Sequence, residues 1–444
     1  MSSYIEKPRT TCSLGGALAV LSSMPGVIPI SHTASGCAGN LSNATAFNSG
    51  YCGSSYCSGQ NVPVSNIGEF QVIFGGGNRL KEEIESTFEL LEGDLFVVTT
   101  GCMTEIIADD LYSVVKEFED EGKPILYVNT PSFEGDAYVG YDLVLDGIFN
   151  NYLKPVKKKD PTLVNIFGVV PLLDPFFRGD LEEIKRLLEK LGLKVNTFFT
   201  ADQTFQNIKS APKAALNIVL SRTHGVKLAK EFEKKHKTPY LITDIPVGAE
   251  QTDEFLKLVA SRLDVEKKVV NKVINEENKN YYSYVERLAD LICDSEFKFY
   301  YHVVSNSSTA LPYAEFLEKE LGWIPENIFI SEALKKRDIP GIEEAFAQKK
   351  LGGQLIFEPH ATQIQRKMTE TMVRSNGSFY QNTHTPVYVL GSTFEKSFIQ
   401  KSASGGLYVS YPVYNRVVLD RGYAGYRGGL HLFEDIFSSL VAGR

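Results

Sequence analysis

Three cysteines share a local pattern that suits metal-cluster binding. Cys12 in TTCSLGGA is followed by glycines, Cys37 in SHTASGCAGN lies between glycines, and Cys102 in TTGCMTEII follows one. Glycine beside a thiolate lets the backbone approach closely, and neighbouring N–H groups can hydrogen-bond cluster sulfurs. Cys102 also lies where an apolar strand is expected to end and a helix to begin, so its thiolate would face a positive helix terminus.

The positions of all six cysteines limit which kinds of metal or redox site the chain could form. Five of the six cysteines lie in the first quarter of the 444-residue chain, which favours ligands or redox chemistry over random core filling. Cys52 and Cys57 are spaced CxxxxC without a second pair, which makes a zinc or thioredoxin-like site a weak interpretation. Cys293 in LADLIC is expected in the core, and core packing is the alternative for any single thiol. Three widely spaced thiols are one short of an ordinary iron–sulfur cluster, so other ligands would come from another chain.

Short apolar runs that alternate with amphipathic helices predict an α/β fold with parallel sheets covered on both faces. The expected strands are 94–100, 124–130, 163–170, 216–221, 239–244, 297–305, 354–359 and 386–392. The expected helices include 78–92, 180–192 and 252–263, with Asp180 and Thr252 as N-caps of the last two. The stretch 264–294 is expected to form a helix, continuous or broken, that bridges two sheets.

The chain length suggests roughly three domains at about 150 residues each. We expect three Rossmann-like domains, each a mostly parallel sheet flanked by helices: a cluster-binding domain at 1–160, a second at 161–270, and a third at 271–444 with a C-terminal helix. The segment 36–77 is dense in Gly, Ser and Asn, and a loop of this length is usually functional or disordered.

Composition excludes several classes of protein. The net charge is −8, and the longest basic run, KPVKKKD at 154–160, is short, which argues against a nucleic-acid partner. No stretch reaches the roughly eighteen apolar residues of a membrane span, and the N-terminus lacks the pattern of a signal peptide. We therefore expect a cytoplasmic protein that has no membrane or nucleic-acid partner.

The sequence resembles the large-subunit family of nitrogenase component 1. This family includes the molybdenum–iron, vanadium–iron and iron–iron proteins, cofactor-assembly scaffolds and dark-operating tetrapyrrole reductases. The shared motifs occur in family order: CSLGGA, HTASGC, EFQVIFGGGNRLKEEI, TTGCMTEIIADD, TPSFEGDAYVGYD and SYPVYNR with GYAGYRGG. TPSF and PVGAEQTDEFLKLV resemble the β-type subunit. Ser221 stands where an α-type subunit carries the cysteine that ligates the active-site cofactor.

The resemblance implies a site and partners. Cys12, Cys37 and Cys102 would be three ligands of a P-cluster-like iron–sulfur centre shared with an α-type subunit in an α2β2 heterotetramer. Ser132 in TPSF matches the serine that can bind the oxidised cluster, and a turn hydroxyl after Pro131 is the alternative. An ATP-dependent iron–sulfur reductase, the Fe protein, would supply electrons. Substrate would be reduced at a cofactor in the partner, so no catalytic residue is assigned to this chain.

Departures from the family pattern leave the role open. The family's IGDD reads IADD here because of Ala108, and the loop after Cys37 is Gly/Ser/Asn-rich and carries two extra cysteines. A nitrogenase-like reductase is therefore as well supported as a dinitrogen-fixing enzyme. A cofactor-assembly scaffold and a tetrapyrrole reductase of the same family are alternatives, and a non-enzymatic α/β binding protein is the alternative outside the family.

Three weaker candidates have simpler explanations. FGGGNRLKEEI at 74–84 is glycine-rich before a helix but matches no nucleotide-binding motif, which favours a helix-entry turn. His32 is expected to cap a turn rather than orient a cluster. His360 follows an expected strand, where α/β folds place ligands, although a lone histidine is more often structural.

Overall fold

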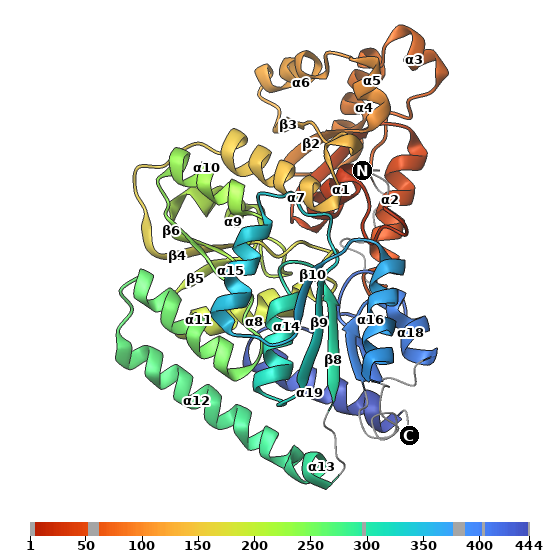
Figure 1. Ribbon diagram of the computed structural model, residues 1–444. Helices are drawn as coiled ribbons and strands as arrows, with labels where there is room; N and C mark the ends of the chain where they lie inside the picture. Colours follow the sequence, from red (N-terminus) through yellow and green to blue (C-terminus); the bar gives the residue numbers. More distant parts are fainter. Residues whose placement is uncertain (1–4, 52–61, 295–298, 376–386, 402–404, 443–444) are drawn as a thin grey trace.

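Three separate parallel β-sheets form the framework of the molecule (Figure 1). The computed structural model describes residues 5–51, 62–294, 299–375, 387–401 and 405–442. Within these residues, all strands that pair inside the three sheets run parallel. The expected fold class, α/β with three parallel sheets flanked by helices, is therefore confirmed.

The first sheet has the order β1-β2-β3, from Val27–His32, Leu95–Thr100 and Ile125–Val128. Leu95 and Val97 pack into the core on the side of α1 (Ser13–Ser23) and α7 (Ala137–Leu145). Phe96 and Val98 pack into a second core with α4 (Gly77–Leu90) and α6 (Leu111–Asp120). Both faces of β2 are buried, which explains its uninterrupted run of apolar and Thr residues.

The second sheet has the order β5-β4-β6-β7, and the third has the order β10-β9-β8-β11-β12. The strands of the second sheet are Lys194–Asn196, Asp160–Phe167, Ala214–Val219 and Tyr240–Ile242, in that spatial order. Those of the third are Gln354–Phe357, Ile324–Ile330, Tyr300–Ser305, Val387–Gly391 and Gly405–Tyr408. The main flanking helices are α8 (Phe177–Lys190), α10 (Val226–His236), α11 (Gly248–Arg262), α14 (Ala310–Lys319), α15 (Ile339–Lys349) and α16 (Ala361–Ser375).

The stretch 264–294 was expected to form either a continuous or a broken helix, and it forms a broken one. It consists of α12 (Lys267–Val285), a 3-10 turn (Glu286–Leu288) and α13 (Ala289–Asp294), and Figure 1 shows α12 lying along α11 at the outside of the molecule. The C-terminal helix α19 (Gly425–Ala442) packs against α8, α11 and α12 and also against β12. The boundaries at 160 and 270 stay predictions. Among the described residues, no helix has both the length and the apolar character to cross a membrane.

Two predicted N-caps are wrong. α8 begins at Phe177 and α11 at Gly248, so Asp180 and Thr252 lie inside their helices. Asp180 is buried, and its carboxylate accepts the backbone N–H groups of Tyr423 at 2.5 Å and Ala424 at 2.8 Å. This side chain therefore anchors the GYAGYRGG segment to the second sheet's helices instead of capping its own helix.

Candidate functional site

The carboxyl edge of the first sheet carries the predicted ligands. β1 leads into α2 (Ser35–Phe47), which contains Cys37, and β2 leads into α5 (Cys102–Ile107), which begins at Cys102. β3 is followed by a 3-10 turn that begins at Ser132, while Cys12 directly precedes α1. All four side chains are half-buried, and the three cysteines are free thiols.

Hydrogen bonds join the segment of Cys12 to that of Ser132. The hydroxyl of Ser13 donates to the backbone oxygens of Thr130 at 3.1 Å and Pro131 at 2.6 Å. These contacts fix the start of α1 against the turn that contains Ser132.

The segments of Cys37 and Cys102 are also joined. Gly101, which precedes Cys102, donates its N–H to the backbone oxygen of His32 at 3.2 Å. A Cβ on Gly101 would lie 2.2 Å from the hydroxyl of Thr33 and 3.8 Å from the side chain of Leu14. Only glycine therefore allows this approach between the two loops.

Cys12 and Cys37 pack against a common apolar cluster formed by Leu14, Leu18 and Ala38. Leu14 is also the residue that Gly101 approaches. The three thiol-bearing segments thus meet around the first turn of α1. Cys52 and Cys57 lie outside the described residues, and so does the side chain of Cys293.

The surroundings of the thiols fit an anionic sulfur-rich group. No side chain caps the start of α1, α2 or α5. Ser13 and Cys37 donate their N–H groups to backbone oxygens, and the other first-turn N–H groups can serve another acceptor. The hydroxyl groups of Thr11 and Thr33 are buried and have no hydrogen-bond partner in the described part of the chain. Unpaired N–H and O–H donors around thiolates are the donor set that an iron–sulfur cluster uses.

The thiols do not form a closed site by themselves. Within the residues that the structure describes, no group of three or more His, Cys, Asp or Glu side chains is placed to hold a metal ion. Cys37 is half-buried between exposed Gly36 and buried Ala38, and a Cβ added to nearby Gly39 would have open space around it.

Large apolar side chains are exposed around this edge of the sheet. Ile106, four residues after Cys102, is 78% exposed, and Phe133, next to Ser132, is 65% exposed. The short helix α3 (Glu69–Phe74) buries none of its residues, and its side chains Phe70, Ile73 and Phe74 all face solvent. Exposed apolar groups gathered in this way mark protein interaction surfaces.

The weaker candidates have structural roles. The ring of His32 is buried, which lowers its pKa to about 4 despite nearby Asp109, so it is neutral at pH 7. Among the described residues, neither ring nitrogen of His32 has a hydrogen-bond partner, so the ring caps no turn there; its backbone oxygen accepts the N–H of Gly101. In the glycine-rich turn before α4, Gly76 donates its N–H to Asp109 at 2.7 Å, as a helix-entry turn does. His360 Nδ1 accepts the N–H of Glu6 at 3.1 Å.

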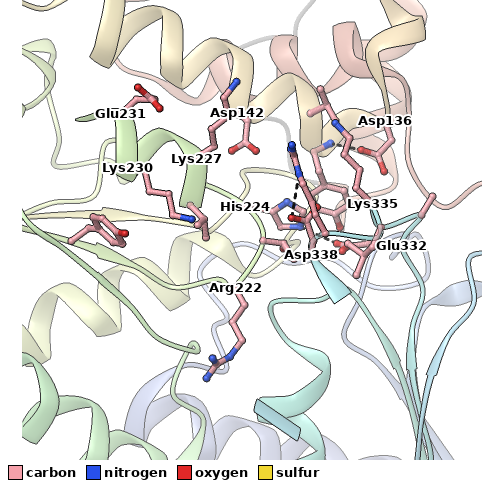
Figure 2. A pocket seen from close by; sticks show the side chains of 18 of the residues that line it. Asp136, Asp142, Arg222, His224, Lys227, Lys230, Glu231, Glu332, Lys335 and Asp338 are labelled. Carbon is pink, nitrogen blue, oxygen red and sulfur yellow. Dashed lines mark hydrogen bonds and ion pairs between the residues drawn. The ribbon is translucent and has the colours of Figure 1, made fainter. Parts of the chain in front are cut away.

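Sequence reasoning did not predict a polar cavity of about 690 Å³ (Figure 2). It lies between α7, α10 and the loop after β9, so helices and loops that flank all three sheets line it. Figure 2 shows Lys227 and Lys230 on the α10 side and Lys335 on the opposite side. The one available signal was His224, since it follows the expected strand 216–221, where parallel sheets place ligand-binding groups.

His224 is the central charged group of this cavity. Its Nε2 lies 3.1 Å from Glu332 Oε1, and its ring stacks on Tyr138 with centroids 4.3 Å apart. Burial disfavours the imidazolium, but Glu332, Asp142 and Asp174 outweigh burial and raise the pKa of His224 to about 9. The histidine is therefore a buried cation at neutral pH.

Comparison with known proteins decides the family. The model of the family "Nitrogenase component 1 type Oxidoreductase" matches residues 12–440. The chain belongs to the nitrogenase component 1 family. Membership makes it a protein of an oxidoreductase family, and the family model begins at the first of the three thiols.

Among members of the nitrogenase component 1 family, several relatives are named as β chains. The molybdenum-iron protein beta chain of Frankia alni is 26% identical, over 98% of this chain and 82% of the relative. The iron-iron protein beta chain of Rhodobacter capsulatus is 29% identical, over 45% and 48%. The cofactor biosynthesis protein NifE of Clostridium pasteurianum is 31% identical, over 48% and 47%. The chain is therefore β-chain-like, at low identity.

A solved nitrogenase component 1 structure has the same fold. The structure "Nitrogenase Cp1 at pH 6.5" aligns with a TM-score of 0.78 at 20% identity, covering 100% of this chain and 94% of that one. At this identity the similarity establishes the fold alone.

Proposed function

We propose that this chain is the β-type subunit of a nitrogenase or nitrogenase-like reductase. Cys12, Cys37 and Cys102, with Ser132, would hold half of a P-cluster-like iron–sulfur centre. An α-type subunit would supply the other half within an α2β2 heterotetramer, and an ATP-dependent Fe protein would supply electrons. The observation that carries the proposal is the convergence of the four segments at one edge of the first sheet.

The bound centre would supply one-electron transfer chemistry, and this chain's residues would place and tune it. Thiolates at the starts of α1, α2 and α5 gain from the positive helix termini, and the unpaired hydroxyls of Thr11 and Thr33 can donate to sulfur. The exposed apolar side chains of Ile106 and Phe133 would be covered by the partner protein, which would exclude water from the thiols.

The α-type cofactor position supports a relay role over a cofactor-holding one. Ser221 is buried at the end of β6, where its Oγ accepts the N–H of His224 at 3.0 Å and of Thr223 at 3.2 Å. Ser308 donates to the same Oγ at 2.8 Å. A hydroxyl that is fully engaged in a turn is not a metal ligand, so reduction of substrate would take place at a cofactor in the α-type partner.

Co-purification tests the half-site. The chain is produced anaerobically with its α-type partner, iron is quantified, and the electron paramagnetic resonance spectrum is recorded. We expect a cluster signal that is lost in Cys37→Ala and kept in Cys293→Ala, which removes a thiol that the proposal does not use. A stable, iron-free wild-type complex would refute the proposal.

A cofactor-assembly scaffold is the second candidate, because the NifE match covers about half of the chain at 31% identity. Electron transfer separates the two roles. A relay subunit's cluster should be reduced by the Fe protein only when MgATP is present, and the electrons should continue to substrate. A scaffold should instead release a cluster to an acceptor protein without steady turnover.

A further inference from the structure

A buried ion pair connects the segment before Cys12 to the third sheet. Arg9 donates through Nη2 to Glu395 Oε1 at 2.6 Å and through Nη1 to Glu395 Oε2 at 3.0 Å. Its Nη1 also donates to Ser392 Oγ at 2.6 Å, and the guanidinium lies over the ring of Phe394. The side chains of Arg9 and Glu395 are 4% and 0% exposed, so solvent does not weaken this pair.

Two further contacts fasten the same segment. Glu6 donates its backbone N–H to His360 Nδ1 at 3.1 Å, and its carboxylate accepts from Thr362 Oγ1 at 3.0 Å. Both partners lie just after β10, in the third sheet's part of the chain. Residues 6–9 therefore form a strap, the segment Glu6–Arg9, that is attached to the third sheet at two places.

On its other side, Cys12 is attached to the first sheet's part of the chain. Ala137 donates its N–H to Thr11 O at 2.9 Å, and Ser13 donates to Gly135 O at 3.1 Å. These bonds flank Cys12 within a short bridge to Asp136. The helix of Cys37 also contacts the third sheet's part of the chain, but at its far end, where Gly50 donates its N–H to Val413 O at 2.7 Å. Cys12 differs because its two attachments lie within a few residues of the thiol on either side.

Packing alone does not fix Cys12 against the third sheet. A cavity of about 240 Å³ is lined by Arg9, Cys12 and Asp136 on one side and by Glu332 and Pro359 on the other. Because this cavity is open and leaves Cys12 without packing atoms on that side, the position of Cys12 relative to Glu332 and Pro359 depends on the strap.

We propose that Arg9 is a positioning residue for the thiol of Cys12. The Arg9–Glu395 pair sets the distance between the third sheet and the segment of Cys12, and through it the place of this thiol relative to Cys37 and Cys102. A bidentate guanidinium–carboxylate pair suits this role because its planar geometry fixes orientation as well as distance. The inference rests on the proposed function only for what the positioned thiol binds.

The test uses the full-length, iron-free chain, so it does not require a cluster. Iodoacetamide is added under native conditions, and alkylation rates of Cys12, Cys37 and Cys102 are measured by mass spectrometry of their peptides. In Arg9→Gln we expect a several-fold faster rate at Cys12 with the other two rates unchanged, because local release exposes only the strapped segment. Arg9→Lys keeps the charge without the planar pair and should give an intermediate rate.

The control is Arg186→Gln, which breaks the comparable pair of Arg186 with Glu277 between α8 and α12. It should leave all three rates unchanged. Equal increases at all three cysteines in Arg9→Gln, or an unchanged rate at Cys12, would overturn the proposal. If Arg9→Gln does not fold, Glu395→Gln replaces it, because this variant breaks the same ion pair and keeps the side-chain volume. It should likewise raise the alkylation rate of Cys12 alone.

A second readout uses the complex with the α-type partner. Arg9→Lys should change the electron paramagnetic resonance line shape of the cluster while the iron content stays at the wild-type level. A wild-type complex without iron would refute the proposed function and leave the alkylation result standing, so the two failures are distinguishable.

Discussion

Thr100 and Thr130 hydrogen-bond each other's backbone in both directions. Thr130 Oγ1 donates to Thr100 O at 3.0 Å and accepts the N–H of Thr100 at 3.2 Å, while Thr100 Oγ1 accepts the N–H of Thr130 at 3.0 Å. Both side chains are fully buried. The pair locks the end of β2, just before Cys102, to the end of β3, just before Ser132.

Replacing Thr130 with Val should therefore destabilise the chain. The substitution keeps the shape but leaves the buried N–H of Thr100 without its acceptor, which costs about 1–3 kcal/mol. Thr130→Ser keeps the hydroxyl, so its free energy of unfolding should lie close to that of wild type. Urea denaturation of the full chain measures both, and equal midpoints for Thr130→Val and wild type would contradict the role of the pair.

Ala108 carries a strain that glycine would remove. Its φ is +59°, in the left-handed region, at the C-terminal end of α5. Since a side chain in this region costs about 1 kcal/mol, Ala108→Gly should raise the free energy of unfolding by up to about that amount. Ala347→Gly, at an exposed helical position in α15, should lower it by about 1 kcal/mol. The melting temperatures of the two variants should shift in opposite directions. A lower melting temperature for Ala108→Gly than for wild type would refute this account.

Gly140 lets α7 contact α1 directly. A Cβ on Gly140 would lie 2.0 Å from the backbone oxygen of Ser13, which follows Cys12. Gly140→Ala must push α1 away and should cost more than about 2 kcal/mol, as overpacking does. Gly39→Ala, with open space around the new Cβ, should be neutral or stabilising. Denaturant unfolding measures the free energy of unfolding of both variants. Equal values for the two variants would show that the α1–α7 contact is loose.

The buried charge of His224 predicts a pH dependence. The folded pKa of about 9 lies above the usual histidine value of 6.5, so between these values the folded chain keeps a proton that the unfolded chain has released. The stabilisation is complete below pH 6.5 and is lost as pH rises through about 9, amounting to roughly 3 kcal/mol. Subtracting the unfolding free energies of His224→Gln from wild type at pH 6, 8 and 10 isolates this term. A difference that stays constant with pH would exclude the buried cation.

The sequence predicted strands that are apolar and β-branched and missed those that are not. LFVVTT and LNIVLS are rich in apolar and β-branched residues; the structure has the first as β2, and β6 (Ala214–Val219) overlaps the second. β1 contains Pro29, β9 contains Pro325, β12 begins with two glycines, and β5 has three residues. These strands form because tertiary pairing overrides weak local preference.

The candidate site was predicted in part for a similar reason. Glycine-flanked cysteines are a local signal that singled out Cys12, Cys37 and Cys102, and the expectation that they share one site came from the family resemblance. The N-cap assigned to Asp180 was wrong because its true partner, Tyr423, is 243 residues away. Arg9 and His224 were not predicted either, since the charges opposite them come from another part of the chain.

The position of α19 bears on how the chain acquires its structure during synthesis. The helices α8, α11 and α12 bury apolar side chains against α19, which is made after the whole third sheet. Until the ribosome has translated residues 425–442, the apolar faces of these helices stay exposed and can bind other proteins. A nascent chain of this kind is expected to need a chaperone late in translation, even though its first sheet can close early.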